Sequence, residues 1–341
     1  MGSPFEGEAH IGRTHLSNYF NQILDPSIKV PFKPYTDDTA MTKQSAISLI
    51  ENKSFNAQDM VKKFANEYFH NPKRGYGSAI GDIFFNLRRT NYADPYGPAS
   101  MQFKGLGSYG NGAAMRVAPV ALFAYHHCSD GDNHDVTPIV NLVTDASKVT
   151  HSNKLGYRGA ILQALAIRLA LLLDKDDFDT ISFANELIQY MTQMEVGDDP
   201  DDPIDGGKSF VTKLELVKQY LNSTEEPHIE EIQNKLGVHV SALDSVPTAI
   251  YCFLAAQKPL ESVPVDCKFH RCIHYAISLG GDTDTIASMA GAIIGAHMGD
   301  EVIPNQFLVH CEHSEDIRKI ADDLYEASKP TKCERYSSKG S

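Results

Sequence analysis

Two short acidic motifs carry the residue types best suited to chemistry in this sequence. They are TDDT at residues 36–39, ahead of a helix that we expect to begin near Ala40, and DTDT at residues 282–285, at the start of a second helix. Asp and Thr also cap helices by accepting hydrogen bonds from free backbone N–H groups, and for either motif alone that interpretation stays open. Capping uses one side chain per helix, whereas each motif offers two carboxylates with hydroxyls beside them. Such oxygens are the ligands of Mg²⁺, Mn²⁺ and Ca²⁺.

The two motifs form a metal site only if the two helix starts meet in space. Four carboxylates in a small volume would then either take up protons or need cations to neutralise them. Two divalent ions would balance the charge, and paired metals commonly activate a water molecule. The sequence thus favours a binuclear site assembled from opposite ends of the chain.

A glycine-rich segment, GLGSYGNG at residues 105–112, lies between the acidic motifs. Such a turn exposes backbone N–H groups that can hold phosphate oxygens. It matches neither the P-loop nor the dinucleotide-binding pattern, so a purely structural turn stays an open alternative. Phe103 and Tyr109 flank the segment and could stack on a base, with core packing as the alternative. Gly75 and Gly77 form a second pair where backbone could approach a ligand, or where the chain simply turns.

Helical periodicity dominates the elements that must position these residues. Apolar stripes recur within residues 60–68, 184–191, 210–221, 269–277 and 317–325. Asn56 and Ser314 are expected to cap the first and last of these helices, and Pro227 and Pro247 to lie in the first turns of two others. Residues 159–173 and 285–298 are apolar on most sides, which predicts buried helices. We therefore predict an all-α fold.

The breaks between these stripes indicate loops within one domain. Residues 196–208 are acidic and rich in Pro and Gly, and residues 128–135 are polar, but helical periodicity resumes after each. We expect a single domain over residues 1–329, followed by a flexible tail over residues 330–341.

Composition excludes several broad classes of protein. The 341 residues include 31 Lys and Arg against 44 Asp and Glu, and the net charge of −13 repels nucleic acid and anionic lipid. No apolar run approaches the roughly 18–20 residues that a membrane helix needs. Six cysteines lie scattered without a Cys-x-x-Cys pair, which is typical of reduced thiols, and the first residues show no signal peptide. We expect an intracellular protein that binds neither membranes nor nucleic acid in general.

Three motifs in a fixed order resemble the ADP-ribosylglycohydrolase family. They are YTDDT at residues 35–39, GSYGNGAAMR at residues 107–116 and GGDTDT at residues 280–285. Shorter segments, TH at 150–151, LGY at 155–157 and SVPTAIY at 245–251, are similar to the type-3 branch of that family. The resemblance extends from about residue 2 to about residue 327. It implies a single all-α domain with a binuclear Mg²⁺ site, which Mn²⁺ or Ca²⁺ could also occupy.

The resemblance also implies roles for individual residues. Glu6 would be the catalytic acid/base on a loop that reaches the metals, and Asp284 would bridge the two ions. The implied metal ligands are Glu6, Thr36, Asp37, Asp38, Asp282, Asp284 and Thr285. The implied substrate-binding residues are Gly75, Gly77, Phe103, Gly107, Ser108, Tyr109, Gly110, Asn111, His151, Leu155 and Val240. Family members usually carry a Gly/Ala-rich helix ahead of the glutamate loop, and we expect this domain to lack it, which would open apolar surface near the metals.

The activity that the resemblance implies is hydrolysis at C1″ of ADP-ribose. The type-3 branch removes ADP-ribose from serine and degrades poly(ADP-ribose), and O-acetyl-ADP-ribose is a further implied substrate. Such a protein would be a monomer acting in the nucleus, the cytoplasm and the mitochondrial matrix, with a link to DNA repair. Two alternatives stay open: a hydrolase of arginine-linked ADP-ribose, and a non-catalytic ADP-ribose-binding or structural relative.

Overall fold

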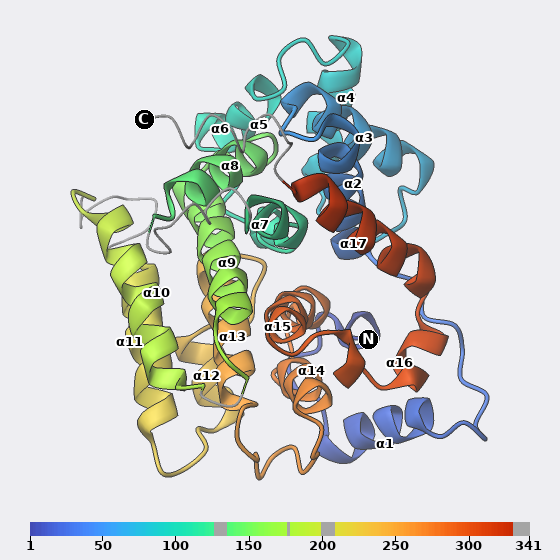
Figure 1. The fold of residues 1–341 in the computed structure, drawn as a ribbon, viewed down its shortest axis with the longest axis vertical. Coiled ribbons are helices and arrows are strands. Elements are labelled where there is room, and N and C mark those ends of the chain that lie inside the picture. The colour runs from blue at the N-terminus through green and yellow to red at the C-terminus, as the bar shows by residue number, and fades with distance from the viewer. Residues whose placement is uncertain (126–134, 176–177, 199–208, 330–341) are drawn as a thin grey trace.

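The protein is built from helices, as a computed structural model shows for residues 1–125, 135–175, 178–198 and 209–329 (Figure 1). These residues contain no β-strand, and two isolated bridges pair Lys33 with Cys311 and Gly110 with Ser241. The all-α prediction is confirmed. The predicted loop at 128–135 and the predicted tail at 330–341 lie wholly or mainly outside the described residues, as does most of the loop at 196–208.

The helices follow one another with short connections. In chain order they are η1 (Ser3–Phe5), α1 (Arg13–Leu24), α2 (Asp37–Asn52), α3 (Ala57–His70), α4 (Ile80–Arg89), α5 (Gly97–Ser100), α6 (Gln102–Gly105), η2 (Asn111–Ala113), α7 (Ala118–Ala124), α8 (Thr137–Lys148), α9 (Lys154–Leu172), α10 (Thr180–Glu195), α11 (Phe210–Asn222), α12 (Ile229–Lys235), α13 (Ala242–Ala255), α14 (Lys268–Ser278), α15 (Thr283–Met298), η4 (Asp300–Val302), α16 (Asn305–His310) and α17 (Ser314–Ser328).

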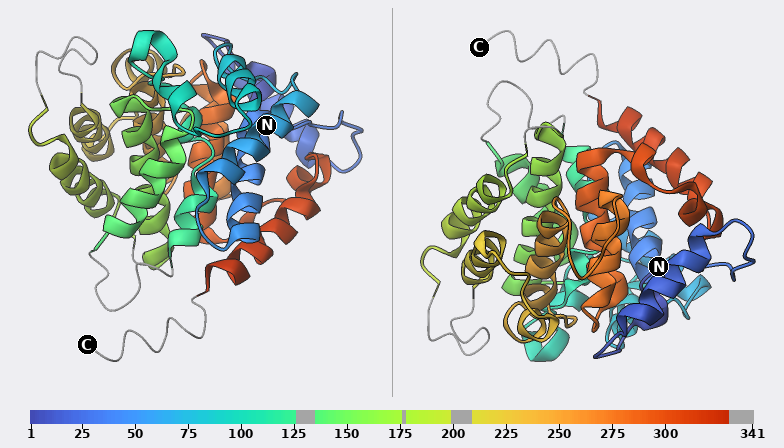
Figure 2. Two further views of the ribbon diagram at one scale, coloured as in Figure 1. Left: turned by 90° about the horizontal axis from the view of Figure 1, so that it is seen from above. Right: turned by 90° about the horizontal axis from the view of Figure 1, so that it is seen from below.

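Helix α15 lies at the centre of the molecule and organises the rest. It contacts α9, α13 and α14, and α2 packs against it from another side (Figures 1 and 2). Helices α10 and α11 form an outer layer over α9 and α13, while α3 and α4 extend outward from α2. One continuous hydrophobic core joins all these layers. The start of α15, which carries the second acidic motif, is thereby held between helices from both halves of the chain.

Small residues let the central helices approach closely. A Cβ built on Gly159 in α9 would lie 2.6 Å from the Cβ of Ala242 in α13, so no larger residue fits at that crossing. The prediction of a buried helix is correct for α9, where Gln163 is 1% exposed and donates to the carbonyl of Met289. The same 19 residues also have the length and hydropathy of a membrane span, contrary to the sequence-based expectation. With 78% of that window buried, α9 is a core helix.

The predicted helix starts are partly confirmed and partly wrong. Asn56 caps α3 by accepting from the backbone N–H of Asp59, as expected. Ser314 is not a cap: it is the first helical residue of α17. His313, at φ 55°, occupies the cap position without a side-chain cap hydrogen bond, and its Nδ1 lies 2.6 Å from Oδ2 of Asp316. Pro247 lies inside α13, not in its first turn, because Ser241 is the extended residue from which that helix begins. Pro227 precedes α12, whose cap position is His228.

Candidate metal and ligand site

The first acidic motif forms the first turn of α2. The helix begins at Asp37, three residues before the predicted start, because the carbonyl of Thr36 already accepts from the N–H of Ala40 at 3.1 Å. Thr36 makes no side-chain cap; its hydroxyl donates to Oδ2 of Asp38 at 3.0 Å. Asp38 is 3% exposed, and its Oδ1 has no hydrogen-bond partner among the described residues. The capping interpretation therefore fails for this motif.

The second acidic motif follows a tight glycine turn. Gly281 has φ +72°, and a Cβ there would collide with the carbonyl oxygen of Val238, so only glycine fits. That carbonyl accepts from the N–H of Asp282 at 2.8 Å, which fixes the end of the turn. Asp282 occupies the cap position of α15 but makes no side-chain cap. Instead its Oδ2 accepts from Nδ2 of Asn111 at 2.6 Å.

Glu6 reaches the second motif from the N-terminal segment. Phe5 anchors that segment at 2% exposure, with its ring 5.0 Å from the ring of Tyr19. On the other side of Glu6, the N–H of Gly7 donates to the carbonyl of Gly281, and the N–H of Gly281 donates to the carbonyl of Glu8, both at 2.8 Å. Glu6 is thus held between a buried aromatic anchor and a reciprocal pair of backbone hydrogen bonds.

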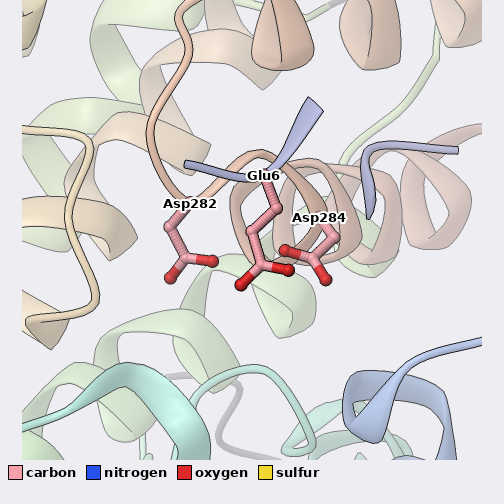
Figure 3. A group of neighbouring side chains, drawn as sticks. All are labelled: Glu6, Asp282 and Asp284. Carbon is pink, nitrogen blue, oxygen red and sulfur yellow. The ribbon is translucent and has the colours of Figure 1, made fainter. Parts of the chain in front are cut away.

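Three carboxyl groups from the two chain ends meet as a result. Oxygens of Glu6, Asp282 and Asp284 lie within 4.8 Å of one another, and Figure 3 shows all three side chains pointing into the same space. Asp282 is buried, Asp284 is half-buried and Glu6 is exposed, so the cluster opens on one side.

Electrostatics place the first motif beside this cluster. Burial and then Asp284 raise the pKa of Asp37 to about 7. The same two causes raise the pKa of Asp38 well above its usual range. Burial, followed by Asp284 and Asp282, also raises the pKa of Glu6. Asp284 is thus the member of the second motif that faces the first: it lines one cavity with Glu6 and Asp37, and the neighbouring groove with Asp38.

The donor set fits hard divalent cations. Carboxylates gathered at short range repel one another unless protons or cations neutralise them, and this repulsion adds to burial in raising the pKa values of Glu6, Asp37 and Asp38. The unpartnered Oδ1 of Asp38 is a buried oxygen to which a bound cation would supply a partner. The described residues thus present a group able to hold a metal ion; its identity stays a prediction.

A cavity of about 420 Å³ opens over the acidic cluster. Its lining includes Glu6, Asp37, Asp282, Asp284 and Thr285 from the predicted metal ligands, and Gly75, Gly77, Phe103, Ser108, Gly110, Asn111, His151 and Val240 from the predicted substrate-binding residues. Thr36 and Asp38 line a separate, mostly apolar groove of about 530 Å³ that Asp284 also borders. Gly107, Tyr109 and Leu155 do not line the 420 Å³ cavity. The structure therefore assembles most, though not all, of the predicted residues.

Phe103 lines the rim of this cavity with Tyr109 beside it, and neither ring is packed in the core. Phe103 and Tyr109 are 50% and 49% exposed, with ring centroids 6.4 Å apart at 38°. The core-packing alternative is therefore wrong for both. Phe103 also has φ 49°, a left-handed conformation that costs a bulky residue on the order of 1 kcal/mol and is found preferentially at functional sites.

Asn111 lines the cavity and also contacts the second acidic motif. Its Nδ2 donates to Oδ2 of Asp282 at 2.6 Å and to Oγ of Ser245 at 3.1 Å, and its backbone N–H donates to the carbonyl of Val240 at 2.8 Å. The residue therefore ties the glycine-rich segment to the second acidic motif. Ser245 and Val238 complete this support and were not singled out as site residues, since nothing in their types or spacing signals it.

We expect Asn111→Ala to weaken divalent-metal binding by about tenfold, because hydrogen bonds that orient ligand carboxylates typically contribute 10- to 100-fold to metal affinity. Calorimetric titration with Mg²⁺ measures this directly. Ser245→Ala is the matched control, since it removes the other partner of the same Nδ2 without touching Asp282, and a change below about threefold is expected. Loss of ADP-ribose binding with unchanged metal affinity in Asn111→Ala would contradict this role.

The metal-free protein should lose stability as the pH rises from about 4 to about 7. Over that range folded Asp37, with its pKa near 7, keeps a proton that the unfolded chain has already released, so the free energy of unfolding falls as the pH rises. We expect a melting temperature several degrees lower at about pH 7.5 than at about pH 5. Saturating Mg²⁺ should reverse the loss, and Asp37→Asn should flatten it. A metal-free melting temperature that rises over this range, or the same slope in Asp37→Asn, would refute the interpretation.

The fold and site together describe a helical protein with a carboxylate-rich centre beneath a cavity of ligand size. The chain belongs to the ADP-ribosylglycohydrolase family, which it matches over residues 1–333. It is 38% identical to the ADP-ribosylhydrolase ARH3 of Gallus gallus, over 96% of this chain and 89% of that protein. The ADP-ribosylhydrolase ARH3 of Homo sapiens is also 38% identical, over 95% and 89% respectively. The protein of that name from Mus musculus is 39% identical, over 85% and 76%.

A solved structure supports the fold independently. It is described as an ADP-ribosylglycohydrolase-related protein complex and matches with a TM-score of 0.58 at 20% identity, over 86% of this chain and 82% of that chain. At this identity the likeness concerns the fold alone.

Proposed function

We propose that this protein is a hydrolase that cleaves the O-glycosidic bond at C1″ of ADP-ribose, releasing ADP-ribose from serine and degrading poly(ADP-ribose). The observation that carries the proposal is the convergence of Glu6, Asp282 and Asp284 within 4.8 Å at one end of a cavity lined by the glycine-rich segment. The relatives named ADP-ribosylhydrolase ARH3 support the substrate class. O-acetyl-ADP-ribose is a further substrate with the same reacting carbon.

Divalent cations, with two Mg²⁺ as our proposal, would be held by Glu6, Thr36, Asp37, Asp38, Asp282, Asp284 and Thr285. When bound they would supply charge neutralisation, an anchor for ribose hydroxyls and a water of lowered pKa. Thr36 and Asp38 approach this centre from the side of the apolar groove, and Asp37 approaches from the cavity.

Glu6 would be the acid/base that moves the proton. Burial, followed by Asp284 and Asp282, raises its pKa, so the carboxyl group keeps a proton to a higher pH than a free glutamate does, and its exposed side chain lines the cavity. As the bond from C1″ to the seryl oxygen breaks, Glu6 gives its proton to that oxygen. A water molecule adds to the oxocarbenium-like carbon and returns a proton to the carboxylate, so that ADP-ribose and serine leave with the enzyme regenerated.

The rest of the cavity would hold the nucleotide. The N–H groups of Ser108 and Tyr109 make no hydrogen bond within the part of the chain that the structure describes, and both remain available to phosphate oxygens. The exposed rings of Phe103 and Tyr109 at the rim offer flat apolar faces to the adenine. Gly75 approaches Asp37 and has φ +89°, so backbone without side chains borders the reacting end.

The cysteines bear on where the protein acts in the cell. Of the cysteines, Cys252, Cys267, Cys272 and Cys311 are free thiols, which supports an intracellular site of action in the nucleus and cytoplasm, with the mitochondrial matrix as a further compartment. We propose that the protein acts as a monomer.

A release assay tests the proposed function. Purified protein is incubated with peptides carrying ADP-ribose on serine or on arginine, with Mg²⁺ or with EDTA. We expect release from serine, abolished by EDTA, and little release from arginine. Preferential release from arginine would show that the protein acts on arginine-linked ADP-ribose and not on the serine linkage. Binding of ADP-ribose without release from either peptide would show that the protein is a non-catalytic relative.

A further inference from the structure

A buried positive charge lies beneath the wall of the cavity without a carboxylate partner. Arg116 is 3% exposed. Its Nη1 and Nη2 both donate to the carbonyl of Ala146 at 3.2 Å, and Nη2 also donates to the hydroxyl of Thr150 at 2.7 Å. It also stacks 4.6 Å from the ring centre of Phe64. Every one of these partners is neutral, and no carboxylate among the described residues pairs with Arg116. Removing a charge from water is costly, so buried guanidinium groups normally have an anionic partner.

A chain of hydrogen bonds connects this charge to the cavity surface. The Thr150 hydroxyl lies 2.8 Å from Nδ1 of His151, and Arg116, Thr150 and His151 all line the 420 Å³ cavity. Because Arg116 can only donate, the Thr150 oxygen accepts from it, and the single hydroxyl hydrogen of Thr150 is free to point at Nδ1. Burial and then the charge of Arg116 lower the pKa of His151 to about 3, so the imidazole is neutral. A neutral imidazole that accepts at Nδ1 carries its hydrogen on Nε2.

The Nε2 edge of His151 lies against the glycine-rich segment. A Cβ built on Gly112 would lie 2.9 Å from Nε2, and one built on Gly110 would lie 3.5 Å from it. A side chain at position 112 would therefore collide with the imidazole ring of His151, and glycine leaves room for that ring. The N–H at Nε2 consequently lies beside the backbone that borders the cavity, where it can donate a hydrogen bond to an anionic group of a ligand.

We propose that Arg116 and Thr150 are positioning residues that select a phosphate-bearing ligand: Arg116 supplies the buried counter-charge, and Thr150 holds His151 as an Nε2–H donor toward the phosphate groups. This inference rests on the proposed function, since it takes the diphosphate of ADP-ribose as the anion. It adds a reason why a phosphate-bearing ligand would bind more tightly than the neutral nucleoside, because only the phosphate compensates the buried charge of Arg116.

The test measures binding of ADP-ribose and of adenosine to the Mg²⁺-loaded full chain by calorimetry. We expect Arg116→Met to raise the Kd for ADP-ribose by at least about tenfold, the contribution of a hydrogen bond to a charged group, and to change that for adenosine by less than about twofold. Arg116→Lys should recover much of the loss, because it restores the charge. Thr150→Val should raise the Kd for ADP-ribose about threefold or more while adenosine is unaffected. Thr144→Val is the matched control, since the Thr144 hydroxyl bonds only the carbonyl of Val140 one turn earlier, and it should change nothing.

A spectroscopic readout separates positioning from folding. The ¹⁵N shifts of His151 should report hydrogen on Nε2 in the wild-type protein and a mixture of tautomers in Thr150→Val, even where Arg116→Met fails to fold. Hydrogen on Nδ1 in the wild type, or ADP-ribose affinity unchanged in a folded Arg116→Met or Thr150→Val, would overturn the inference alone. A wild-type protein that binds no ADP-ribose would overturn the proposed function and this inference with it.

Discussion

Replacing Glu6 by Gln should reduce turnover by about a thousandfold and leave ADP-ribose binding within about threefold. The amide has the shape of the carboxyl group but can neither give a proton to the leaving oxygen nor take one from water. The loop should stay in place, because it is held by buried Phe5 and by the backbone pair between Gly281 and residues 7 and 8, none of which involves the Glu6 side chain. The measurement pairs the rate of release from a serine-ADP-ribosylated peptide with the Kd for ADP-ribose in the same Mg²⁺ buffer.

Glu8→Gln is the matched control for that variant. Glu8 lies two residues further along the same loop, is exposed, and contributes to the site only through its backbone carbonyl. Its replacement should leave the rate within about twofold. A Glu6→Gln protein with wild-type turnover would remove Glu6 from the role of acid/base.

Replacing Asp284 by Ala should abolish metal binding and activity together. Among the described residues, Asp284 is the one carboxylate that borders both the cavity and the apolar groove. After burial, its charge is the next cause that raises the pKa values of Glu6, Asp37 and Asp38. Loss of a ligand shared by both motifs should weaken Mg²⁺ binding beyond the roughly hundredfold seen for supporting residues. We expect no detectable binding heat at millimolar Mg²⁺ and no release of ADP-ribose.

The same variant should be more stable than the wild type when metal is absent. Removing Asp284 relieves the repulsion on Asp37 and Asp38, so the melting temperature in EDTA should rise by a few degrees at about pH 7.5. A variant that simply misfolds would show the opposite. Wild-type Mg²⁺ affinity in a folded Asp284→Ala protein would contradict the shared position of this residue.

The sequence predicts which residues carry the chemistry of the site better than it predicts the residues that hold them in position. Pairs of Asp and Thr at residues 36–39 and 282–285 predict hard-metal ligands by composition alone. The structure groups Asp282 and Asp284 with Glu6, and Asp37 lines the same cavity, whereas Asp38 lines the neighbouring groove. The sequence predicts the start of α2 three residues too late. In a sequence, an acidic pair that forms the first turn of a helix cannot be told from an acidic pair that caps the helix. Only the three-dimensional structure shows that neither cap position, Thr36 or Asp282, makes a side-chain cap.

Features that depend on contacts between distant segments are invisible to periodicity. The hydrogen bond from Asn111 to Asp282 joins residues 171 positions apart, and no local pattern marks Asn111 as a support for a carboxylate. Arg116 likewise follows the glycine-rich segment and looks like an ordinary basic residue in the sequence. Only the structure shows that it is buried and donates to Thr150. Pro247 misled the prediction because helix α13 is buried along its length and retains a proline that an isolated helix would not tolerate.

Anomalous diffraction from crystals grown with Mn²⁺ and ADP-ribose tests the central claim most directly, because Mn²⁺ accepts the same oxygen ligands as Mg²⁺ and can be located independently of the protein. We expect two anomalous peaks between Asp37–Asp38 and Asp282–Asp284, with the distal ribose of ADP-ribose beside them and Glu6 within reach of C1″. The absence of peaks at this position, or peaks bound elsewhere while the two aspartate pairs remain metal-free, would contradict the assignment.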